Sequence, residues 1–342
     1  MDPQVLGMKV GLIGAGRIGQ IHGRNLAVQL PGVRLAMVAD IDLRAAQSLA
    51  DQYGVRQVTT DYRELLSTPD LAAVAICSAT DTHASIIQEA AKAGKHIFCE
   101  KPIDFDLARI DLALSAVQAA GVSLQIGFNR RFDPNFRRVR ELVGEGQIGE
   151  PHLLRITSRD PEPPPPEYIK VSGGIFLDMT IHDFDMARFL IRSEVEELYA
   201  AGGVRVDPEI GRLGDLDTAV IMLKFENGVI GTIDNSRTAV YGYDQRVEIF
   251  GSKGMVSTEN ETPDRHTLSD QEGVHGPLPM HFFLERYQAS YLEEMRSFVE
   301  CVRTDKQPEA SGMDGRIPVV MGLAARKSYE QNRPVRLSEI TV

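Results

Sequence analysis

The sequence predicts an α/β protein of two domains, a doubly wound parallel sheet followed by an α+β domain on a large open sheet. Up to about residue 127, short apolar runs alternate with helical stretches at the spacing of β/α units. Beyond that point, strand-like runs follow one another with turn signals between them, which is typical of a mainly antiparallel sheet. A chain of 342 residues suits two domains better than one, and we expect them at 1–127 and 128–342.

Composition limits the class of partner. The net charge of −11 argues against nucleic acid or an anionic membrane as the main partner. No run is long and apolar enough to span a bilayer. The three cysteines, Cys77, Cys99 and Cys301, are too few and too scattered for a disulfide framework or a zinc cluster, so we expect no metal and a cytoplasmic location. Residues 1–7 read as a leader, with Met8 as a second start.

A glycine-rich turn follows the first apolar strand, residues 9–13. It reads Gly14-Ala15-Gly16-Arg17-Ile18-Gly19 and leads into a helical stretch over 18–28. In this context the first glycine makes the turn, the second lets the backbone approach a pyrophosphate, and the third lets helix pack on strand. The helix N-terminus then faces the phosphates with its positive end. We therefore expect a dinucleotide to bind at Gly14, Gly16, Arg17 and Ile18.

The second strand, residues 33–39, ends in Asp40, about twenty residues beyond the glycine turn. A carboxylate there can accept hydrogen bonds from both adenosine ribose hydroxyls and would repel a 2′-phosphate. The next arginine is Arg44, so the sequence favours NAD over NADP. The alternative is that Asp40 merely caps the next helix.

Further strands are predicted at 73–78, 95–99 and 123–127, with helices up to residue 93 and over 106–120. Ligands of such sheets bind outside the carboxyl ends of the strands, and we expect Ser78, Ala79, His83, Glu100 and Lys101 to line the cofactor site there. Lys101 could donate a hydrogen bond to a substrate hydroxyl that loses hydride, and stabilise the developing alkoxide. The alternative is a surface lysine that pairs with Glu100.

The second half of the chain predicts a helix over 135–143 and strands at 152–157, 218–225, 229–236 and 246–250. Asn227-Gly228 is a strong hairpin signal, and residues 250–254 form another turn. A sheet with one open face exposes apolar surface, so we expect an oligomer. A last helix at about 315–332 should pack back on the nucleotide domain. The proline run at 161–166 reads as a rigid connector or pocket rim, with a polyproline II ligand as the alternative.

Residues 173–185 hold the most informative side chains. Asp178 and His182 are four apart and Asp185 is three further on, so on one helix they share a face. Apolar residues run between them. An imidazole between two carboxylates is a candidate general acid/base near neutral pH. The alternative is a salt-bridged histidine with a structural role.

Together these motifs resemble the Gfo/Idh/MocA oxidoreductases over essentially the whole chain: the glycine turn, Glu100-Lys101-Pro102 and the downstream Asp-x-x-x-His. Within that family the likeness is greatest to inositol dehydrogenases, on residues 127–133, 178–185 and 241–244. The resemblance implies a Rossmann domain, an open-sheet domain and usually a homotetramer. It also implies a catalytic set of Lys101, Asp178 and His182. Substrate contacts would fall on these three and on Arg131, Asp160, Asp185, Tyr241 and Tyr243.

The expected reaction is oxidation of a ring hydroxyl of a cyclic polyol to a ketone, with hydride transfer to NAD. His182 is the general base, Lys101 the electrophile, and Asp178 orients both, so no metal is needed. One alternative is the same chemistry on an aldose or another sugar or polyol. Another is a non-catalytic NAD-binding regulator, which the complete catalytic set disfavours.

Overall fold

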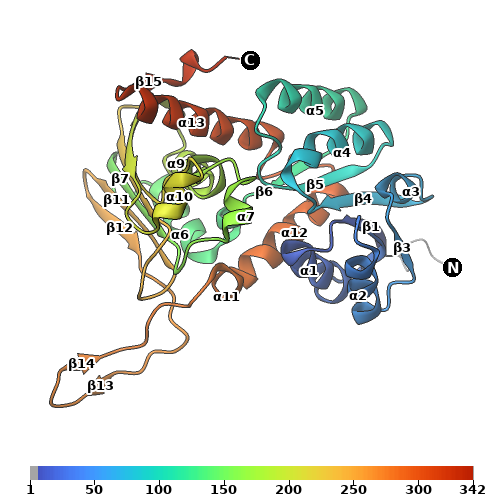
Figure 1. The fold of residues 1–342 in the computed structure, drawn as a ribbon, viewed down its shortest axis with the longest axis horizontal. Coiled ribbons are helices and arrows are strands. Elements are labelled where there is room, and N and C mark those ends of the chain that lie inside the picture. The colour runs from blue at the N-terminus through green and yellow to red at the C-terminus, as the bar shows by residue number, and fades with distance from the viewer. Residues whose placement is uncertain (1–6, 342) are drawn as a thin grey trace. The chain divides into compact units, whose positions relative to one another are not determined.

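The computed structural model describes residues 7–341, so the predicted leader lies outside the described residues except for Gly7. The chain divides into two compact units. The first runs to Phe132 and takes in Ala289–Ile317, and the second comprises Asp133–Gln288 and Pro318–Thr341 (Figure 1). The sequence pattern did not anticipate the return of 289–317 to the first unit.

The first unit is built on a six-stranded sheet of order β3-β2-β1-β4-β5-β6 in which every pairing is parallel. This confirms the predicted doubly wound Rossmann sheet. Its strands read as near-continuous apolar runs because both faces are covered. They are β1 (Met8–Ile13), β2 (Val33–Ala39), β3 (Gln57–Thr59), β4 (Leu71–Ile76), β5 (His96–Glu100) and β6 (Leu124–Gly127).

Aspartates begin several helices of this unit. Asp42, Asp61 and Asp106 each accept a hydrogen bond from a backbone N–H of the helix that follows. The last helix brings Met295, Phe298 and Val299 into the core that holds Val10 and Leu12, which is why it belongs here. The helices are α1 (Arg17–Arg24), which continues as a π-helix (Asn25–Gln29), α2 (Leu43–Tyr53), α3 (Tyr62–Leu66), α4 (Thr80–Lys92), α5 (Leu107–Ala120), a 3₁₀ turn (Asn129–Phe132) and α12 (Gln288–Thr304).

The second unit is built on a seven-stranded sheet of order β12-β11-β7-β10-β9-β8-β15. β7 and β10 pair in parallel and the remaining neighbours pair antiparallel, so the mainly antiparallel prediction is confirmed. Gly228, with φ +88°, closes the predicted hairpin between β9 and β10. The strands are β7 (Pro151–Arg159), β8 (Val195–Gly203), β9 (Thr218–Phe225), β10 (Ile230–Ser236), β11 (Asp244–Gly251), β12 (Gly254–Thr258) and β15 (Val335–Arg336).

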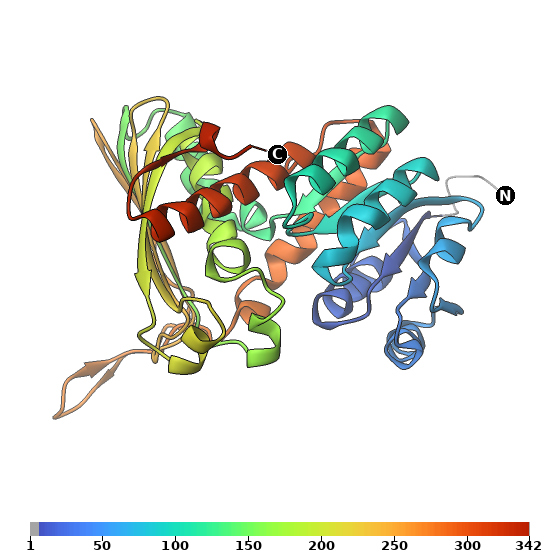
Figure 2. The same ribbon diagram turned by 45° about the horizontal axis from the view of Figure 1, so that its top comes forward.

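One face of this sheet is packed and the other is open. On β9, Ala219, Ile221 and Leu223 are buried while Val220 and Met222 are half exposed, the period-two pattern of a sheet covered on one side. The helices of this unit lie on the packed side, among them α6 (Pro134–Gly144) and α9 (Thr180–Ile191) (Figure 2). The open side carries exposed apolar side chains: Leu153, Val220, Met222, Ile230, Phe250 and Met255.

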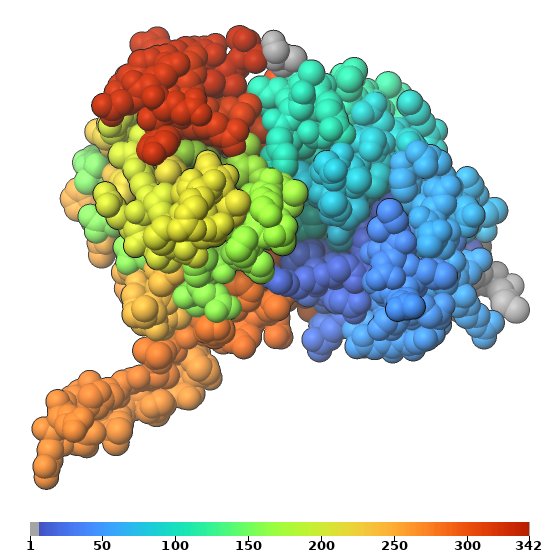
Figure 3. Space-filling model, in the orientation of Figure 1, coloured from blue at the N-terminus to red at the C-terminus, as the bar shows by residue number. Residues whose placement is uncertain are grey.

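Short elements complete the second unit. The proline run leads into α7 (Pro166–Ile169). The middle of the segment between β12 and α11 projects as a long arm that carries the two-residue strands β13 (Leu268–Ser269) and β14 (Val274–His275) (Figures 1 and 3). The others are α8 (Ile175–Asp178), α10 (Pro208–Arg212), α11 (Phe283–Arg286) and a 3₁₀ turn (Leu337–Glu339).

The last long helix is α13 (Gly312–Gln331), close to the predicted 315–332. It crosses the division between the units. Its first turns belong to the first unit, where Gly315 meets Ile103 and Ile126, and the rest packs in the second, where Gly322 meets Leu177. In the described part of the chain, no helix is long and apolar enough to cross a membrane.

Candidate active site

The glycine turn has the geometry that its motif predicts. A Cβ at Gly14, which has φ +97°, would lie 2.5 Å from the Cys77 carbonyl, and a Cβ at Gly19 would collide with the Gly14 carbonyl oxygen. A Cβ at Gly16 would meet nothing within 4 Å. Packing therefore explains the first and third glycines, while the second borders open space through which a phosphate can approach the backbone.

Asp40 lies beside this turn at the carboxyl end of β2. Its Oδ2 accepts a hydrogen bond from the Ala15 N–H at 2.6 Å, and its Oδ1 accepts one from the Asp42 N–H at 2.8 Å. The cap of α2 is Asp42, whose carboxylate accepts from the Arg44 N–H. Asp40 is thus held at the strand end next to the glycine turn and is not the residue that begins the helix.

The ends of β4 and β5 are joined by a histidine. The His83 ring is buried, with Nε2 2.9 Å from the Ser78 carbonyl oxygen and Nδ1 2.8 Å from that of Pro102. Burial lowers the pKa of His83, although both carbonyl contacts oppose that shift. His83 therefore braces the strand ends that carry Ser78, Ala79, Glu100 and Lys101. The Lys101–Pro102 peptide bond is cis.

Two charged residues of the first unit face inward. Glu100 is 9% exposed, and its Oε1 lies 2.8 Å from His22 Nε2. The Arg131 guanidinium donates to the Glu309 carbonyl at 2.7 Å and to Asp314 Oδ1 at 2.9 Å. Burial would raise the pKa of Asp314, but the Arg131 charge and the Ser311 hydrogen bonds bring it below its usual value. Arg131, predicted to contact substrate, is thus anchored within its own unit.

The segment around Asp178 and His182 forms two helices where the sequence predicts one. Asp178 is the last residue of α8, and His182 lies in the first turn of α9, with Met179 between the helices. At this junction the Thr180 hydroxyl donates both to the Ile175 carbonyl and to Asn235 Oδ1. A helical period cannot reveal such a break, because Met179 itself has right-handed helical angles.

Arg237 fixes Asp178, and the sequence analysis missed it. Its guanidinium is 1% exposed and donates to Asp178 Oδ2 at 3.2 Å and to Asp215 Oδ2 at 3.3 Å. The Tyr168 hydroxyl donates to Asp178 Oδ1 at 2.7 Å, so both carboxylate oxygens are held. Burial alone would lower the pKa of Arg237, but three neighbouring carboxylates raise it, those of Asp178, Asp215 and Asp160.

The start of α9 is tied to β10. Asn235 donates from Nδ2 to Asp183 Oδ2 at 2.8 Å and accepts from the Thr180 hydroxyl at 2.5 Å. His182 lies between these two tethered residues, so the backbone that carries its ring is fixed. Asp185, one turn further, is buried.

The two predicted substrate tyrosines lie in other surroundings. The Tyr241 hydroxyl donates to Asp244 at 2.6 Å and accepts from Arg159, which also pairs with Asp234. Asp234 and Asn235 are neighbours on β10 and point to opposite faces, so the Tyr241 network lies on the face away from α9. Tyr243 is buried against the Phe282 and Tyr287 rings. Neither tyrosine takes part in the contacts described above among Arg237, Asp178, Asp215 and Tyr168.

Two family models together match more than two thirds of the chain. The model described as "Oxidoreductase family, NAD-binding Rossmann fold" covers residues 8–128, and the GFO/IDH/MocA C-terminal domain covers residues 136–257. The chain belongs to the GFO/IDH/MocA family. It is an NAD-dependent dehydrogenase that acts on a CH–OH group, and its NAD binding is what the glycine turn and Asp40 predict.

Several family members are similar along their whole length. The chain is 49% identical over 333 residues to a myo-inositol 2-dehydrogenase of Thermotoga maritima, covering 97% of this chain and 99% of that one. It is 44% identical to an inositol 2-dehydrogenase of Rhizobium meliloti, with 97% and 99% covered. A crystal structure of Lactobacillus casei scyllo-inositol dehydrogenase with NAD(H) and scyllo-inositol superposes with a TM-score of 0.91 at 30% identity, with 97% and 99% covered.

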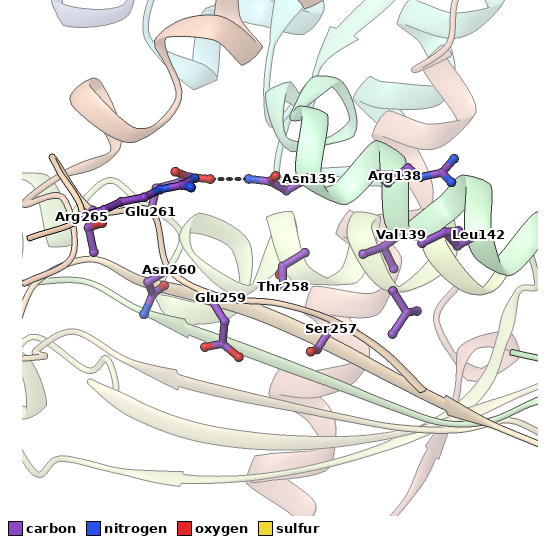
Figure 4. Close-up of a pocket in the computed structure, with 12 residues that line it drawn as sticks. Asn135, Arg138, Val139, Leu142, Ser257, Thr258, Glu259, Asn260, Glu261 and Arg265 are labelled. Atoms are coloured by element: carbon purple, nitrogen blue, oxygen red, sulfur yellow. Dashed lines mark hydrogen bonds between the residues drawn. The ribbon is translucent and has the colours of Figure 1, made fainter. Parts of the chain in front are cut away.

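The second unit of the present protein also contains a cavity of about 360 Å³, away from Asp178 and Arg237. It is bounded by α6 and the segment after β12, and Asn135 Nδ2 donates to Glu261 Oε1 across it at 2.7 Å (Figure 4). Its lining residues include none of the predicted site residues. This cavity is therefore separate from the Asp178–Arg237 network.

Proposed function

We propose that this protein oxidises a ring hydroxyl of an inositol to the ketone, with NAD as the acceptor. The observation that carries the proposal is Asp178, held by Arg237 and Tyr168 four positions before His182. His182 lies on a backbone that hydrogen bonds to Asn235 hold in place, and a neutral imidazole there would suit proton abstraction from a hydroxyl. The relatives named as inositol dehydrogenases, which match from end to end, support the substrate class.

The first unit fits the nucleotide. The open space at Gly16 would accept the pyrophosphate. Arg17, Ile18, Ser78 and Ala79 are the further candidate contacts, and the buried His83 would act by bracing the strand ends. The Asp40 carboxylate accepts from the ribose hydroxyls and disfavours a 2′-phosphate. When bound, NAD supplies the hydride acceptor.

In the proposed reaction, different side chains accept the proton and stabilise the charge on the reacting oxygen. His182, neutral, takes the proton of the reacting hydroxyl at a ring nitrogen, which needs a heavy-atom approach of about 2.6–3.2 Å. Lys101 donates to the same oxygen and stabilises its negative charge as the C–H bond breaks. Asp178, whose carboxylate oxygens Arg237 and Tyr168 hold, would orient His182.

Of the other predicted substrate contacts, Asp160 and Asp185 would read neighbouring hydroxyls. The observed contacts of Arg131, Tyr241 and Tyr243 direct those side chains elsewhere.

We also propose a homotetramer and a cytoplasmic location. The half-exposed apolar side chains on the open sheet face, such as Met222 and Phe250, favour burial against another copy. The three cysteines are free thiols, which suits a reducing compartment.

The test is the initial rate of NADH formation with myo-, scyllo- and D-chiro-inositol and D-glucose, each with NAD and with NADP. We expect turnover of an inositol with NAD, and His182→Ala should lower kcat by roughly 10²–10⁴-fold with NAD binding intact. Turnover of glucose but of no inositol would mean that the substrate is an aldose and not an inositol. Tight NAD binding without any turnover would favour a regulator, and full activity of His182→Ala would remove the assigned base.

A further inference from the structure

A buried cluster of three ionisable side chains lies beneath the strand end that carries Lys101. His22 comes from α1, Glu100 from the end of β5 and Glu294 from α12, all within the first unit. One ligating atom of each lies within 4.8 Å of the others. His22 Nε2 is 2.8 Å from Glu100 Oε1 and 3.7 Å from Glu294 Oε1. His22 and Glu294 are fully buried.

The hydrogen bonds of the cluster restrict its charge state. His22 Nδ1 and both Glu294 carboxyl oxygens are buried without a hydrogen-bond partner. An imidazolium would need an acceptor at each ring nitrogen, and Nδ1 has none. The neutral ring with its proton on Nε2 satisfies Glu100. Two carboxylates so close together in an apolar interior cannot both remain ionised, since each charge would be desolvated and would repel the other.

In the part of the chain that the structure describes, aromatic rings and a backbone carbonyl line the surroundings of the cluster. The His22 ring contacts the rings of Phe98 and Tyr291 edge to face, and the Gln125 amide donates to the Glu294 backbone carbonyl at 2.7 Å. Besides Tyr291, the described ionisable groups that face the cluster include the Cys77 and Cys99 thiols. Burial raises the pKa of both, and the Glu100 charge raises it further, so they stay neutral.

The cluster is one of two anchors on either side of Lys101. Glu100 immediately precedes it, and its carboxyl is packed so closely that a Cβ on Gly127 of β6 would lie 3.0 Å away. Pro102 immediately follows, and its carbonyl is held by the buried His83 ring at 2.8 Å. The backbone of Lys101 is therefore fixed on both sides by buried groups.

We propose that His22, Glu100 and Glu294 form a proton-holding cluster in which Glu294 is a neutral carboxylic acid, and that this cluster positions Lys101. Glu294 lets Glu100 remain a carboxylate bound to His22 without an opposing charge. Ionisation of Glu294 would set two carboxylates against each other and loosen the strand end. Glu294 is thus a positioning residue, and its effect on turnover rests on the function proposed above for Lys101.

The first test compares the melting temperatures of wild type, Glu294→Gln and Glu300→Gln from about pH 5 to about pH 9. Burial, and then the Glu100 charge, raise the pKa of Glu294 above its ordinary 4.5. Between the ordinary pKa of Glu294 in the unfolded chain and its raised pKa in the folded protein, the folded state binds more protons than the unfolded one. The free energy of unfolding of wild type therefore falls as pH rises through this range. An amide cannot ionise, so the melting temperature of wild type should fall relative to that of Glu294→Gln. Glu300, exposed on the same helix, is the matched control, and Glu300→Gln should follow wild type.

Two results of this test would overturn the proposal. One is a melting-temperature difference between wild type and Glu294→Gln that is constant or grows in favour of wild type as pH rises, which an ionised Glu294 paired with an imidazolium would give. The other is a stoichiometric metal ion bound to these three residues, found by elemental analysis of the purified protein and lost in Glu294→Gln. Neither readout needs a substrate, so the charge state can be decided even if the proposed function fails.

The positioning role has its own readout. Glu294→Ala should lower kcat by about 10- to 100-fold, since misplacement of a reacting group by about 1 Å costs up to that much, while NAD affinity stays near wild type. Glu294→Gln should restore turnover and should keep its activity at alkaline pH better than wild type. Equal loss of kcat in both variants, or a loss confined to NAD affinity, would contradict positioning of Lys101.

Discussion

At the scale of the residue, the centre of the candidate site in the second unit is Arg237. It is the buried cation that faces the carboxylates of Asp178 and Asp215, and its charge explains how two acids coexist in that interior. Sequence spacing pointed to Asp178 and His182. It could not point to Arg237, because the chain brings the arginine there from the end of a strand far along the sequence.

Arg237→Met tests this role. The change removes the donor and leaves two carboxylates, 12% and 9% exposed, without their cation, so the free energy of unfolding should fall by about 3 kcal/mol. The matched control is Arg212→Met, whose exposed guanidinium pairs with Glu209 and should contribute no more than about 1 kcal/mol. Urea unfolding followed by circular dichroism measures both. Equal midpoints for the two variants would mean that Arg237 does not neutralise this pair.

At the level of single helices and strands, the sequence pattern predicts those elements whose bounds depend on neighbouring residues alone. Strands such as β2 and β9 were placed at their observed bounds because apolar runs and the Asn227-Gly228 turn are short-range signals. β8 carries Glu196, Glu197 and two glycines and was missed, since its pairing with β9 rather than its own residues makes it a strand. The break between α8 and α9 depends on Asn235, which no local window contains.

Gly16→Ala separates folding from cofactor binding in the strand–turn–helix element. Gly16 has φ −69° and open space around its Cβ position, so alanine should leave the melting temperature unchanged or slightly raised. A methyl group there should obstruct the pyrophosphate and weaken NAD binding by about tenfold or more, about 1.4 kcal/mol. Gly254→Ala, equally open on β12, is the control, and calorimetry measures NAD affinity. Wild-type affinity in Gly16→Ala would show that the nucleotide does not approach this backbone.

At the scale of the whole molecule, the sequence analysis anticipated a chain of two parts, but not how the chain is divided between them. The apolar face of α12 packs with Leu12 and Phe98, residues from the beginning of the chain, and such long-range pairing has no sequence signature. In the described residues of the second unit, one face of the seven-stranded sheet is left open, with apolar side chains exposed on it. We expect other copies to cover it.

Met222→Glu tests that expectation. Met222 is 49% exposed on β9, so a carboxylate there should leave the fold intact but oppose burial of the face, and the assembly should dissociate. Leu112→Glu is the control, because Leu112 is 60% exposed on α5 of the other unit. Light scattering coupled to size-exclusion chromatography gives the mass. A monomeric wild type, or an unchanged mass for Met222→Glu, would contradict assembly through this face.

In the proposed reaction, hydride passes from an inositol ring carbon to NAD. The most direct measurement uses myo- or scyllo-inositol deuterated at every ring carbon, with the reduced cofactor analysed by mass spectrometry. We expect reduced NAD that carries a single deuterium, together with the deuterated ketone, and loss of both products in Lys101→Met and His182→Ala. Reduced cofactor without deuterium, or no reduced cofactor from any inositol, would contradict the proposed reaction.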